Sequence, residues 1–394
     1  MITVNKALEL IKKSSKKRDD FEIIEINKAL NKVIAEDIIA PISLPPFKQS
    51  IMDGYAICLH DNLEYKIVGE IKTGDHANLE LKPGEAVRIF TGATVPKTAN
   101  VVVMQENVLK QNLTIILNDI PKLGLNIRNQ GEQIKKGEVS LKKGEQLNPS
   151  SLGLLKSFGQ ETVKVEVIPK ITVITTGNEL IPAGTQLQPG QIYESNSQVI
   201  QSALAQKGIT VTANFKVKDS LEETTQVLSN SIEKSDIVLI SGGISVGDYD
   251  FVSDALNNLG VDQIFYKVLQ KPGKPLYFGK KDKTYVFALP GNPASTLTCL
   301  YVYVFPLIDK ILGRNKIGLK QITLPISTDF NNSFGKALFL KAKIENSEVI
   351  ILNQQNSAMI LSFAHADALV YIPSISKAIK KGDLVTVYLL PQIV

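Results

Sequence analysis

The sequence predicts a multidomain α/β plus β protein, in which a three-layer α/β/α domain is combined with β-rich domains. The chain has 394 residues, which is more than one compact core usually holds. Strand and helix patterns alternate between residues 169 and 317, as in open, mostly parallel sheets covered by helices on both faces. Short β patterns separated by Gly and Pro turn signals fill residues 46–138 and 318–394.

Composition excludes several classes of protein. Hydrophobic residues make up 44% and charged residues 21%, which excludes disorder as the main state. The net charge of +5 is spread along the chain and there is no Trp, so we expect no nucleic-acid partner. The two cysteines lie far apart, and the longest apolar runs are too short to span a bilayer. Without a signal-peptide pattern at the N-terminus, a cytoplasmic protein with no membrane partner is expected.

The first third of the chain predicts a small β domain inserted between helical segments. Pro41, Pro45 and Pro46 block a helix and mark the boundary before this domain. Asn148 can cap a helix that has Pro149 in its first turn. Helices are expected over 5–13, 28–34 and 150–158, and strands over 65–68, 86–90, 101–104 and 114–117.

The α/β domain follows and ends in a separate β domain. Asn196 or Ser197 is available to cap its first helix, and Gly208 lies just past the end of that helix. The α/β strands are expected over 171–174, 209–215, 236–240 and 285–289, and the helices over 198–206, 221–232, 251–259 and 294–311. The C-terminal strands are expected over 338–344, 349–352, 368–372 and 384–389.

A Gly-rich loop over residues 241–250 follows a buried strand and opens a helix. Its glycines allow backbone N–H groups to point into a concavity, which favours a phosphate. Asp250 can cap the helix or hold a divalent ion. A tight turn without a ligand is about equally consistent with the pattern, which is neither a Walker A loop nor GxGxxG. The candidate substrate-binding residues of this loop are Gly242, Gly243, Ser245, Gly247 and Asp248.

A second loop repeats this arrangement before the last helix of the domain. Asn292 is a good N-cap and Pro293 a good first helical residue, so a well-capped helix would also explain the pattern. Because strand C-termini converge on one crevice in an open sheet, two such loops together favour a binding site. The candidate residues of this loop are Pro290, Gly291, Asn292, Pro293 and Ser295.

Three lysines lie on a proline-containing segment, at positions 267, 271 and 274. Lys267, Lys271 and Lys274 beside two anion-binding loops suggest a polyanionic ligand. A solvated basic turn is the commoner meaning of such a cluster.

Three carboxylates are expected at the same edge of the sheet. Glu179 and Asp219 follow strands, as Asp250 does, and together they could hold magnesium beside a phosphate. A cap is the simpler explanation for each one alone, above all for Asp219, which precedes a helix. The convergence of the three is what favours a metal.

Other candidate residues lie outside the α/β domain. Asp53 precedes Gly54, so a turn explains it well. Arg128 lies in a polar loop and suits a bidentate contact to phosphate or carboxylate. The three histidines form no triad or metal-ligand spacing, and there is no GxSxG motif, so hydrolase chemistry of the nucleophile-elbow type has no support.

Seven segments in order resemble the molybdopterin molybdotransferase family, which includes bacterial MoeA and the E domain of gephyrin. Each segment is modest alone, but the match covers nearly the whole chain. The segments are Pro45-Pro46-Phe47 with Met52-Asp53-Gly54-Tyr55-Ala56, Phe90-Thr91-Gly92-Ala93, Ile127-Arg128 with Gly131-Glu132, Thr176-Gly177-Asn178-Glu179-Leu180, Ser241-Gly242-Gly243-Ile244-Ser245-Val246-Gly247, Lys271-Pro272-Gly273-Lys274-Pro275 and Leu289-Pro290-Gly291-Asn292-Pro293.

The resemblance implies an activity and the residues that serve it. Members insert molybdate into adenylylated molybdopterin, with release of AMP and with Mg²⁺ or a similar ion, to form molybdenum cofactor. By motif position, Pro290 and Pro293 match structural prolines at the site. The residues that match positions implicated in activity are Asp53, Thr91, Glu179, Asp219, Asp250, Lys267 and Lys271.

The resemblance also implies four domains and a homodimer. These would be an elongated N-terminal linker and dimerisation domain over 1–45 and 139–168, a β-rich lid over 46–138, a molybdopterin-binding catalytic domain over 169–317 and a β-barrel-like domain over 318–394. The active site would lie between the α/β domain of one subunit and the lid of the other. Lys336 stands where members often carry Arg and cannot make a planar bidentate contact, whereas Ser357 and Ser362 lie near the expected places.

Two other functions are open at this point. A molybdopterin adenylyltransferase of the same α/β type would bind ATP and molybdopterin, but the lid and C-terminal domains favour the later step. A non-catalytic scaffold like the gephyrin E domain is weakly supported, because the chain shows no long linker or second fused domain.

Overall fold

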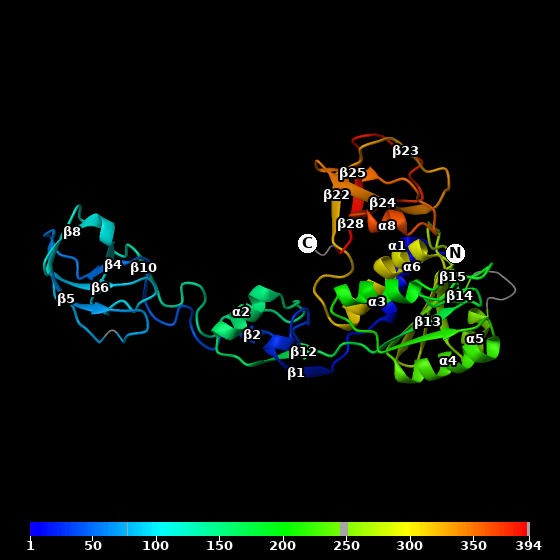
Figure 1. Cartoon of the computed structure of the whole chain (residues 1–394), viewed down its shortest axis with the longest axis horizontal. Coiled ribbons are helices and arrows are strands. Elements are labelled where there is room, and N and C mark those ends of the chain that lie inside the picture. The colour runs from blue at the N-terminus through cyan, green and yellow to red at the C-terminus, as the bar shows by residue number, and fades with distance from the viewer. Residues whose placement is uncertain (77, 245–250, 392–394) are drawn as a thin grey trace. The chain divides into compact units, whose positions relative to one another are not determined.

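The computed structural model describes residues 1–76, 78–244 and 251–391 (Figure 1). The chain forms two compact units. The first unit comprises Met1–Ala35, Gly144–Leu152 and Thr162–Val394, and the second comprises Glu36–Lys143 and Gly153–Glu161. The finer division into four domains stays a prediction.

A six-stranded sheet is the centre of the first unit. Its strand order is β16-β13-β17-β21-β20-β18. The first four strands are parallel, and β20 runs antiparallel to both of its neighbours, so the sheet is mostly parallel as predicted. The strands are β13 (Ile171–Thr176), β16 (Ala213–Val217), β17 (Ile237–Ser241), β18 (Asp262–Tyr266), β20 (Tyr277–Lys281) and β21 (Thr284–Leu289).

Helices cover both faces of this sheet, which confirms the three-layer α/β/α prediction (Figure 1). Side chains alternate along β17: Ile237 and Leu239 pack in one core, and Val238 and Ile240 pack in the other. This fully apolar strand is typical of a sheet covered on both faces. One core is shared with α1 (Val4–Ser14), α3 (Asn196–Gln206) and α6 (Pro293–Cys299), and the other with α4 (Leu221–Lys234) and α5 (Val252–Asn258).

The predicted helix over 294–311 forms with a change of pitch in its middle. It consists of α6, the π-helical segment η3 (Leu300–Val304) and α7 (Phe305–Ile311). By length and composition alone the segment Pro293–Ile311 could cross a membrane, but 83% of its most apolar window is buried inside the structure. This burial is that of a core helix.

The C-terminal segment forms a second sheet of the first unit, in the order β19-β24-β26-β28-β22, with β25 paired to β24. All four predicted strands of this segment form. β19 (Gln270–Lys271) comes from the lysine segment and pairs in parallel with β24, which the sequence did not predict. The other elements are β22 (Gln321–Pro325), β23 (Phe330–Asn331), β24 (Ala337–Glu345), β25 (Glu348–Ile351), α8 (Leu361–Ala364), β26 (Ala368–Ile372), β27 (Ala378–Ile379) and β28 (Leu384–Leu389).

The prediction of a helix over residues 28–34 is wrong. A short 3₁₀ helix, η1 (Ile26–Lys28), ends there, and Asn31 takes a left-handed φ of 66° that a helix cannot continue through. Ile34 then forms a β-bridge with Val165 of β12 (Thr162–Glu166), which also pairs with β1 (Phe21–Glu25). Backbone pairing with a distant strand therefore overrides the local pattern.

One other boundary differs from the prediction. The strand expected over 209–215 is β16, which begins only at Ala213. The residues before it end α3 instead, because Gly208 has a left-handed φ of 75° and Ile209 N–H donates to Leu204 O in the last turn of the helix. α2 (Pro149–Ser157) forms as predicted, and Asn148 Oδ1 accepts from Ser151 N–H at 2.9 Å.

The second unit contains a six-stranded sheet in the order β7-β4-β6-β5-β9-β8. The four strands predicted here all form. In β9, for example, buried and partly exposed side chains alternate, which matches the alternation of residues expected for a strand with one buried face. The elements are β2 (Ile38–Ile39), β3 (Gln49–Ser50), β4 (Gly54–Ile57), β5 (Glu64–Ile71), β6 (Glu85–Ile89), β7 (Val101–Met104), η2 (Gln105–Asn107), β8 (Val108–Gln111), β9 (Thr114–Leu117), β10 (Ile127–Arg128) and β11 (Val139–Leu141).

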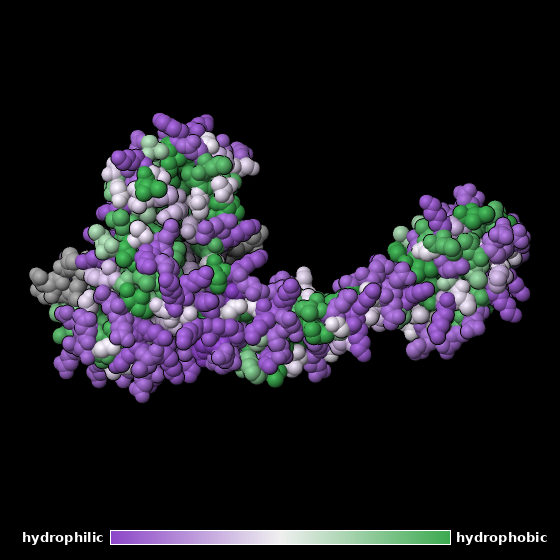
Figure 2. All heavy atoms as spheres, turned by 180° about the vertical axis from the view of Figure 1, so that it is seen from behind, coloured by the Kyte–Doolittle hydropathy of each residue, from purple (hydrophilic) through white to green (hydrophobic). Residues whose placement is uncertain are grey.

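Hydrophilic side chains cover most of the face drawn in Figure 2, and apolar side chains gather there in smaller patches. Such scattered apolar groups are ordinary on a folded protein.

Candidate functional site

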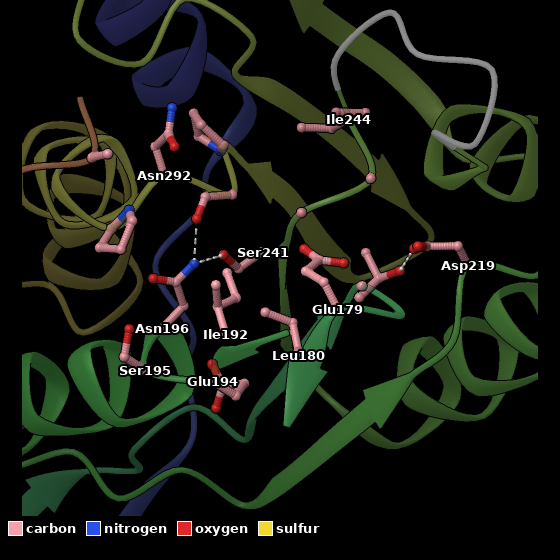
Figure 3. Close-up of a pocket in the computed structure, with 18 of the residues that line it drawn as sticks. Glu179, Leu180, Ile192, Glu194, Ser195, Asn196, Asp219, Ser241, Ile244 and Asn292 are labelled. Atoms are coloured by element: carbon pink, nitrogen blue, oxygen red, sulfur yellow. Dashed lines mark hydrogen bonds between the residues drawn. The ribbon is translucent and has the colours of Figure 1, made fainter. Parts of the chain in front are cut away.

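A cleft of about 620 Å³ opens at the carboxyl ends of β13, β17 and β21 (Figure 3). Polar side chains and backbone from the segments that follow these strands line it, together with the segment that leads into α3. This is the place where an open parallel sheet ordinarily binds its ligand. The lining residues are Thr176, Gly177, Glu179, Leu180, Ile192, Tyr193, Glu194, Ser195, Asn196, Asp219, Ser241, Gly242, Gly243, Ile244, Pro275, Pro290, Gly291, Asn292, Pro293 and Ala358.

The turn after β17 requires glycine at two successive positions. Gly242 and Gly243 have φ of 99° and 61°, respectively. A Cβ at position 242 would lie 2.6 Å from Thr176 O, and a Cβ at position 243 would lie 2.8 Å from Val252 Cγ2. The N–H of Gly243 has no acceptor among the described residues. The N–H of Gly243 is therefore available to an anion, and the predicted phosphate-binding role of this loop stays a prediction. Ser245, Gly247, Asp248 and Asp250 lie outside the described residues.

The loop before α6 lies against this turn. A Cβ at Gly291 would come within 3.5 Å of Gly242 Cα, so the two predicted anion loops are neighbours. The N–H of Gly291 likewise has no acceptor in the described part of the chain. Pro290 and Pro293 line the cleft, whereas Ser295 is 2% exposed inside α6 and does not.

Asn292 is the N-cap residue of α6, but its side chain does not cap the helix. Its Nδ2 donates instead to Ser357 Oγ at 3.0 Å, and Ala294 N–H donates to Ser357 O at 3.1 Å. The C-terminal segment thus takes the position that the predicted cap would have occupied, and it brings Ala358 to the edge of the cleft.

Asn196 joins the two loops and was missed as a site residue by the sequence analysis, which considered it only as a helix cap. Its Nδ2 donates to Ser241 Oγ at 2.9 Å and to Gly291 O at 2.6 Å (Figure 3). The cap prediction for Asn196 and Ser197 is wrong, because both lie inside α3 and Ser195 is its N-cap residue. The carboxylate of Glu194 accepts from Ser197 N–H at 2.9 Å and satisfies the helix start.

Two of the three predicted carboxylates line the cleft. Glu179 is exposed and its carboxylate accepts no hydrogen bond from the described residues. Asp219 accepts from Thr176 Oγ1 at 2.8 Å and from Asn178 N–H at 3.1 Å. Asp219 is not the cap of α4; Ser220 caps it, through Oγ and Glu223 N–H. Within the described ranges no group of three His, Cys, Asp or Glu residues could hold a metal ion.

The three predicted lysines do not line this cleft. Lys267 lies over the Tyr266 ring at 4.6 Å, with φ of 67°. Lys271 Nζ lies 3.6 Å from the centre of the Phe334 ring and lines a neighbouring pocket of about 490 Å³, which Ser357 also lines. Lys274 is exposed, beside the cleft-lining Pro275.

The second unit brings together two other predicted residues. Asp53 Oδ1 accepts from both N–H and Oγ1 of Thr91, each at 2.8 Å. These two hydrogen bonds, the one from N–H first, hold the pKa of the Asp53 carboxyl below its usual value. Arg128 is exposed at the end of β10.

A buried lysine organises the segment that carries Ser357, and no sequence signal identified it. Lys341 is 2% exposed, and its Nζ donates to the carbonyl oxygens of Gln354 (2.9 Å), Asn356 (3.3 Å) and Met359 (3.1 Å). Burial lowers the pKa of Lys341. Its position in the middle of an apolar strand pattern could have marked it as unusual, since lysine is rarely buried.

Three family models match successive parts of the chain. Residues 2–159 match the MoeA N-terminal region (domain I and II), residues 172–310 a probable molybdopterin binding domain, and residues 323–390 the MoeA C-terminal region (domain IV).

Relatives and solved structures agree with these models. A molybdopterin molybdenumtransferase of Staphylococcus epidermidis is 32% identical over 396 residues, covering 97% of this chain and 94% of its own length. One of Haemophilus influenzae is 40% identical over 299 residues, covering 75% and 74%. The crystal structure of the molybdopterin biosynthesis moeA protein of Pyrococcus horikoshii OT3 has a TM-score of 0.85 at 28% identity and covers 99% of this chain and 100% of its own. The chain therefore belongs to the molybdopterin molybdenumtransferase (MoeA) family.

Proposed function

We propose that this chain is a molybdopterin molybdenumtransferase, which inserts molybdate into adenylylated molybdopterin and releases AMP and molybdenum cofactor. The observation that carries the proposal is the convergence of two glycine loops in one cleft of a MoeA-family chain, where the N–H groups of Gly243 and Gly291 have no acceptor among the residues that the structure describes. Backbone N–H groups at a strand-to-helix turn bind phosphate oxygens well. A substrate that carries a diphosphate and a terminal phosphate suits such a cleft.

The loops can bind phosphate without a large rearrangement of the backbone. Asn196 holds Ser241 and Gly291 together, and the positive φ of Gly243 is already set. Donors that are fixed before the ligand arrives need no reorganisation during the reaction. Lys267, Lys271 and Lys274 would add positive charge on the approach to the cleft and attract the molybdate dianion.

Magnesium would be held by Glu179, Asp219 and Asp250. Carboxylate oxygens are the ligands that Mg²⁺ prefers, and one or two of them suffice when substrate phosphates and waters complete the shell. The carboxylates of Glu179 and Asp219 both line the cleft, so the residues fit. When bound, the ion supplies positive charge at the diphosphate.

The protein needs no nucleophile of its own in this reaction. The dithiolene sulfurs of the substrate capture molybdenum, and cleavage of the diphosphate is linked to that capture. The residues of the chain bind, orient and neutralise charge, which accounts for most of the catalysis in phosphate chemistry of this kind.

We further propose that the enzyme is a cytoplasmic homodimer without nucleic-acid or membrane partners. Asp53, Thr91 and Arg128 of the second unit would then act on the substrate bound by another copy. The bonds from Thr91 to Asp53 keep that carboxylate ionised and fixed in orientation.

The test is AMP release from adenylylated molybdopterin by the purified full chain. AMP that appears only when molybdate and Mg²⁺ are both present supports the proposal. Formation of adenylylated molybdopterin from ATP and molybdopterin would assign an adenylyltransferase instead. Binding of adenylylated molybdopterin without any turnover would assign a non-catalytic binding protein.

A further inference from the structure

A second cavity lies away from the cleft, between the helices of the first unit and its C-terminal sheet. We name it the α1–α7 pocket; α1, η3, α7, the segment 313–319 and strands β22 and β28 line it, and its volume is about 460 Å³. Its floor is apolar and well buried: Ile11 is 1% exposed, Val302 2%, Tyr301 7% and Tyr388 8%. Such a floor favours an apolar group over water.

Four cations surround this floor: Lys12, Lys17, Lys310 and Arg314. Lys12 and Lys310 lie in the last turns of α1 and α7, and neither forms an ion pair within the described part of the chain. Lys17 pairs with Glu166 at 2.8 Å. The negative end of the helix dipole favours a cation at a helix C-terminus, which would explain Lys12 and Lys310 individually. It does not explain why four cations surround one apolar cavity.

Arg314 leaves the pocket with an excess of positive charge. Its guanidinium is 8% exposed and shares the buried Asp309 carboxylate with Lys207, at 3.2 Å and 2.8 Å. One negative charge thus faces two positive ones. Arg314 Nε is also buried without an acceptor among the described residues.

Two of the four cations are paired with carboxylates, Lys17 with Glu166 and Arg314 with Asp309, but neither carboxylate lines the cavity. Among the residues that the structure describes, no Asp or Glu lines the α1–α7 pocket. Burial raises the pKa of both Tyr301 and Tyr388 to about 12, so both phenols are neutral near pH 7. The electrostatic field in the cavity is therefore positive, because these two carboxylates offset only part of the charge of the four cations.

We propose that the α1–α7 pocket binds an amphipathic anion, a small molecule with one acidic group on an apolar chain or ring. The apolar part would lie on Ile11, Val302 and the two tyrosine rings, and the acidic group would meet Lys12, Lys310 and Arg314. A purely polar anion would leave the floor exposed to water, and a neutral apolar molecule would leave Lys12 and Lys310 without an ion-pair partner in the described part of the chain. The site is separate from the proposed transferase chemistry.

The experiment is a calorimetric titration of the full chain with a homologous series of carboxylates, hexanoate, octanoate and decanoate, each below its micelle concentration and at low salt. We expect saturable binding that tightens about threefold to fourfold for each added methylene group. We expect octanol to bind less tightly than octanoate and octylammonium not to bind. Equal affinity for octanoate and octylammonium, or no saturable binding of decanoate, would overturn the proposal.

Matched variants locate the site. Lys12→Gln with Lys310→Gln should weaken octanoate at least about fivefold, whereas Lys13→Gln, the same change one residue further along α1 at a lysine paired with Glu9, should not. Unchanged affinity in the double variant would reject the pocket. Because the chain contains no Trp, Ile317→Trp places a single tryptophan at the rim, and its emission spectrum, excited apart from the tyrosines, should shift with octanoate.

The Ile317→Trp variant also distinguishes a small-molecule ligand from a second copy of the chain as the occupant of the pocket. If a second copy of this chain covers the pocket, the Ile317→Trp emission will change with protein concentration, and octanoate will have no effect on it. That outcome would overturn the small-molecule proposal.

Discussion

Glu179 and Asp219 both line the cleft, but of their two carboxylates only that of Asp219 accepts hydrogen bonds from the described residues. Glu179→Gln and Asp219→Asn remove the same charge from the same cleft. We therefore expect both variants to lose activity and only Asp219→Asn to lose stability.

The magnitude follows from the two bonds of Asp219. A hydrogen bond to a charged group contributes about 1.5–3 kcal/mol. An Asn at 219 keeps one carbonyl acceptor, and its NH₂ would face either the hydroxyl of Thr176 or the N–H of Asn178. We expect Asp219→Asn to lower the free energy of unfolding by about 1.5–3 kcal/mol and Glu179→Gln, an exposed change, by less than about 0.5 kcal/mol.

Two assays measure this difference: urea unfolding followed by circular dichroism, and AMP release as a function of Mg²⁺. If both carboxylates serve the ion, each variant should lose at least about tenfold in AMP release at low Mg²⁺ and recover in part at high Mg²⁺. A Glu179→Gln enzyme with wild-type activity at every Mg²⁺ concentration would show that Glu179 does not hold the ion. Asp219→Asn with unchanged stability would show that its two bonds contribute little.

Three further predictions test other parts of the molecule. Gly243→Ala forces a left-handed φ on Ala and a clash with Val252, so urea unfolding should show a loss of about 2 kcal/mol or more, with AMP release falling further than that loss explains. Lys341→Met removes the charged donor from the carbonyl oxygens of Gln354, Asn356 and Met359, which keep only the neutral donors Ser362 Oγ and Met359 N–H, and should lower the free energy of unfolding by about 1.5–3 kcal/mol in the same measurement. Because Thr91 lowers the pKa of Asp53 in the folded state, the stabilisation from Asp53 is complete above about pH 4 and is lost as the pH falls through its folded pKa. Acid unfolding should therefore be less steep in Asp53→Asn than in the wild type over this range, and identical acid curves would contradict the prediction.

Much of the fold could be predicted from the sequence, because its strands have strong local patterns. The fully apolar run of β17 and the alternating run of β9 both lie where their periods indicated. Local pattern failed where a distant strand decided the conformation, as at Ile34, which pairs with Val165. It also failed at β19, which joins the C-terminal sheet although it is only two residues long.

The candidate site was predicted where backbone geometry dictates the residue type. Gly242 and Gly243 need positive φ, and that requirement is visible in the sequence. The bridge by Asn196 and the approach of Ser357 to Asn292 could not be predicted, because they join side chains from segments that are far apart in the chain. At Asn292 the local pattern predicted a side-chain cap of the helix. Its side-chain amide instead donates a hydrogen bond to Ser357, which lies 65 residues away in the chain.

We propose that the N–H groups of Gly243 and Gly291 hold the diphosphate of the substrate. A crystal structure of the full chain with adenylylated molybdopterin measures this directly. We predict phosphate oxygens within hydrogen-bond distance of both N–H groups, with Glu179 at the same diphosphate. A diphosphate bound elsewhere, with both N–H groups left to water, would contradict the claim.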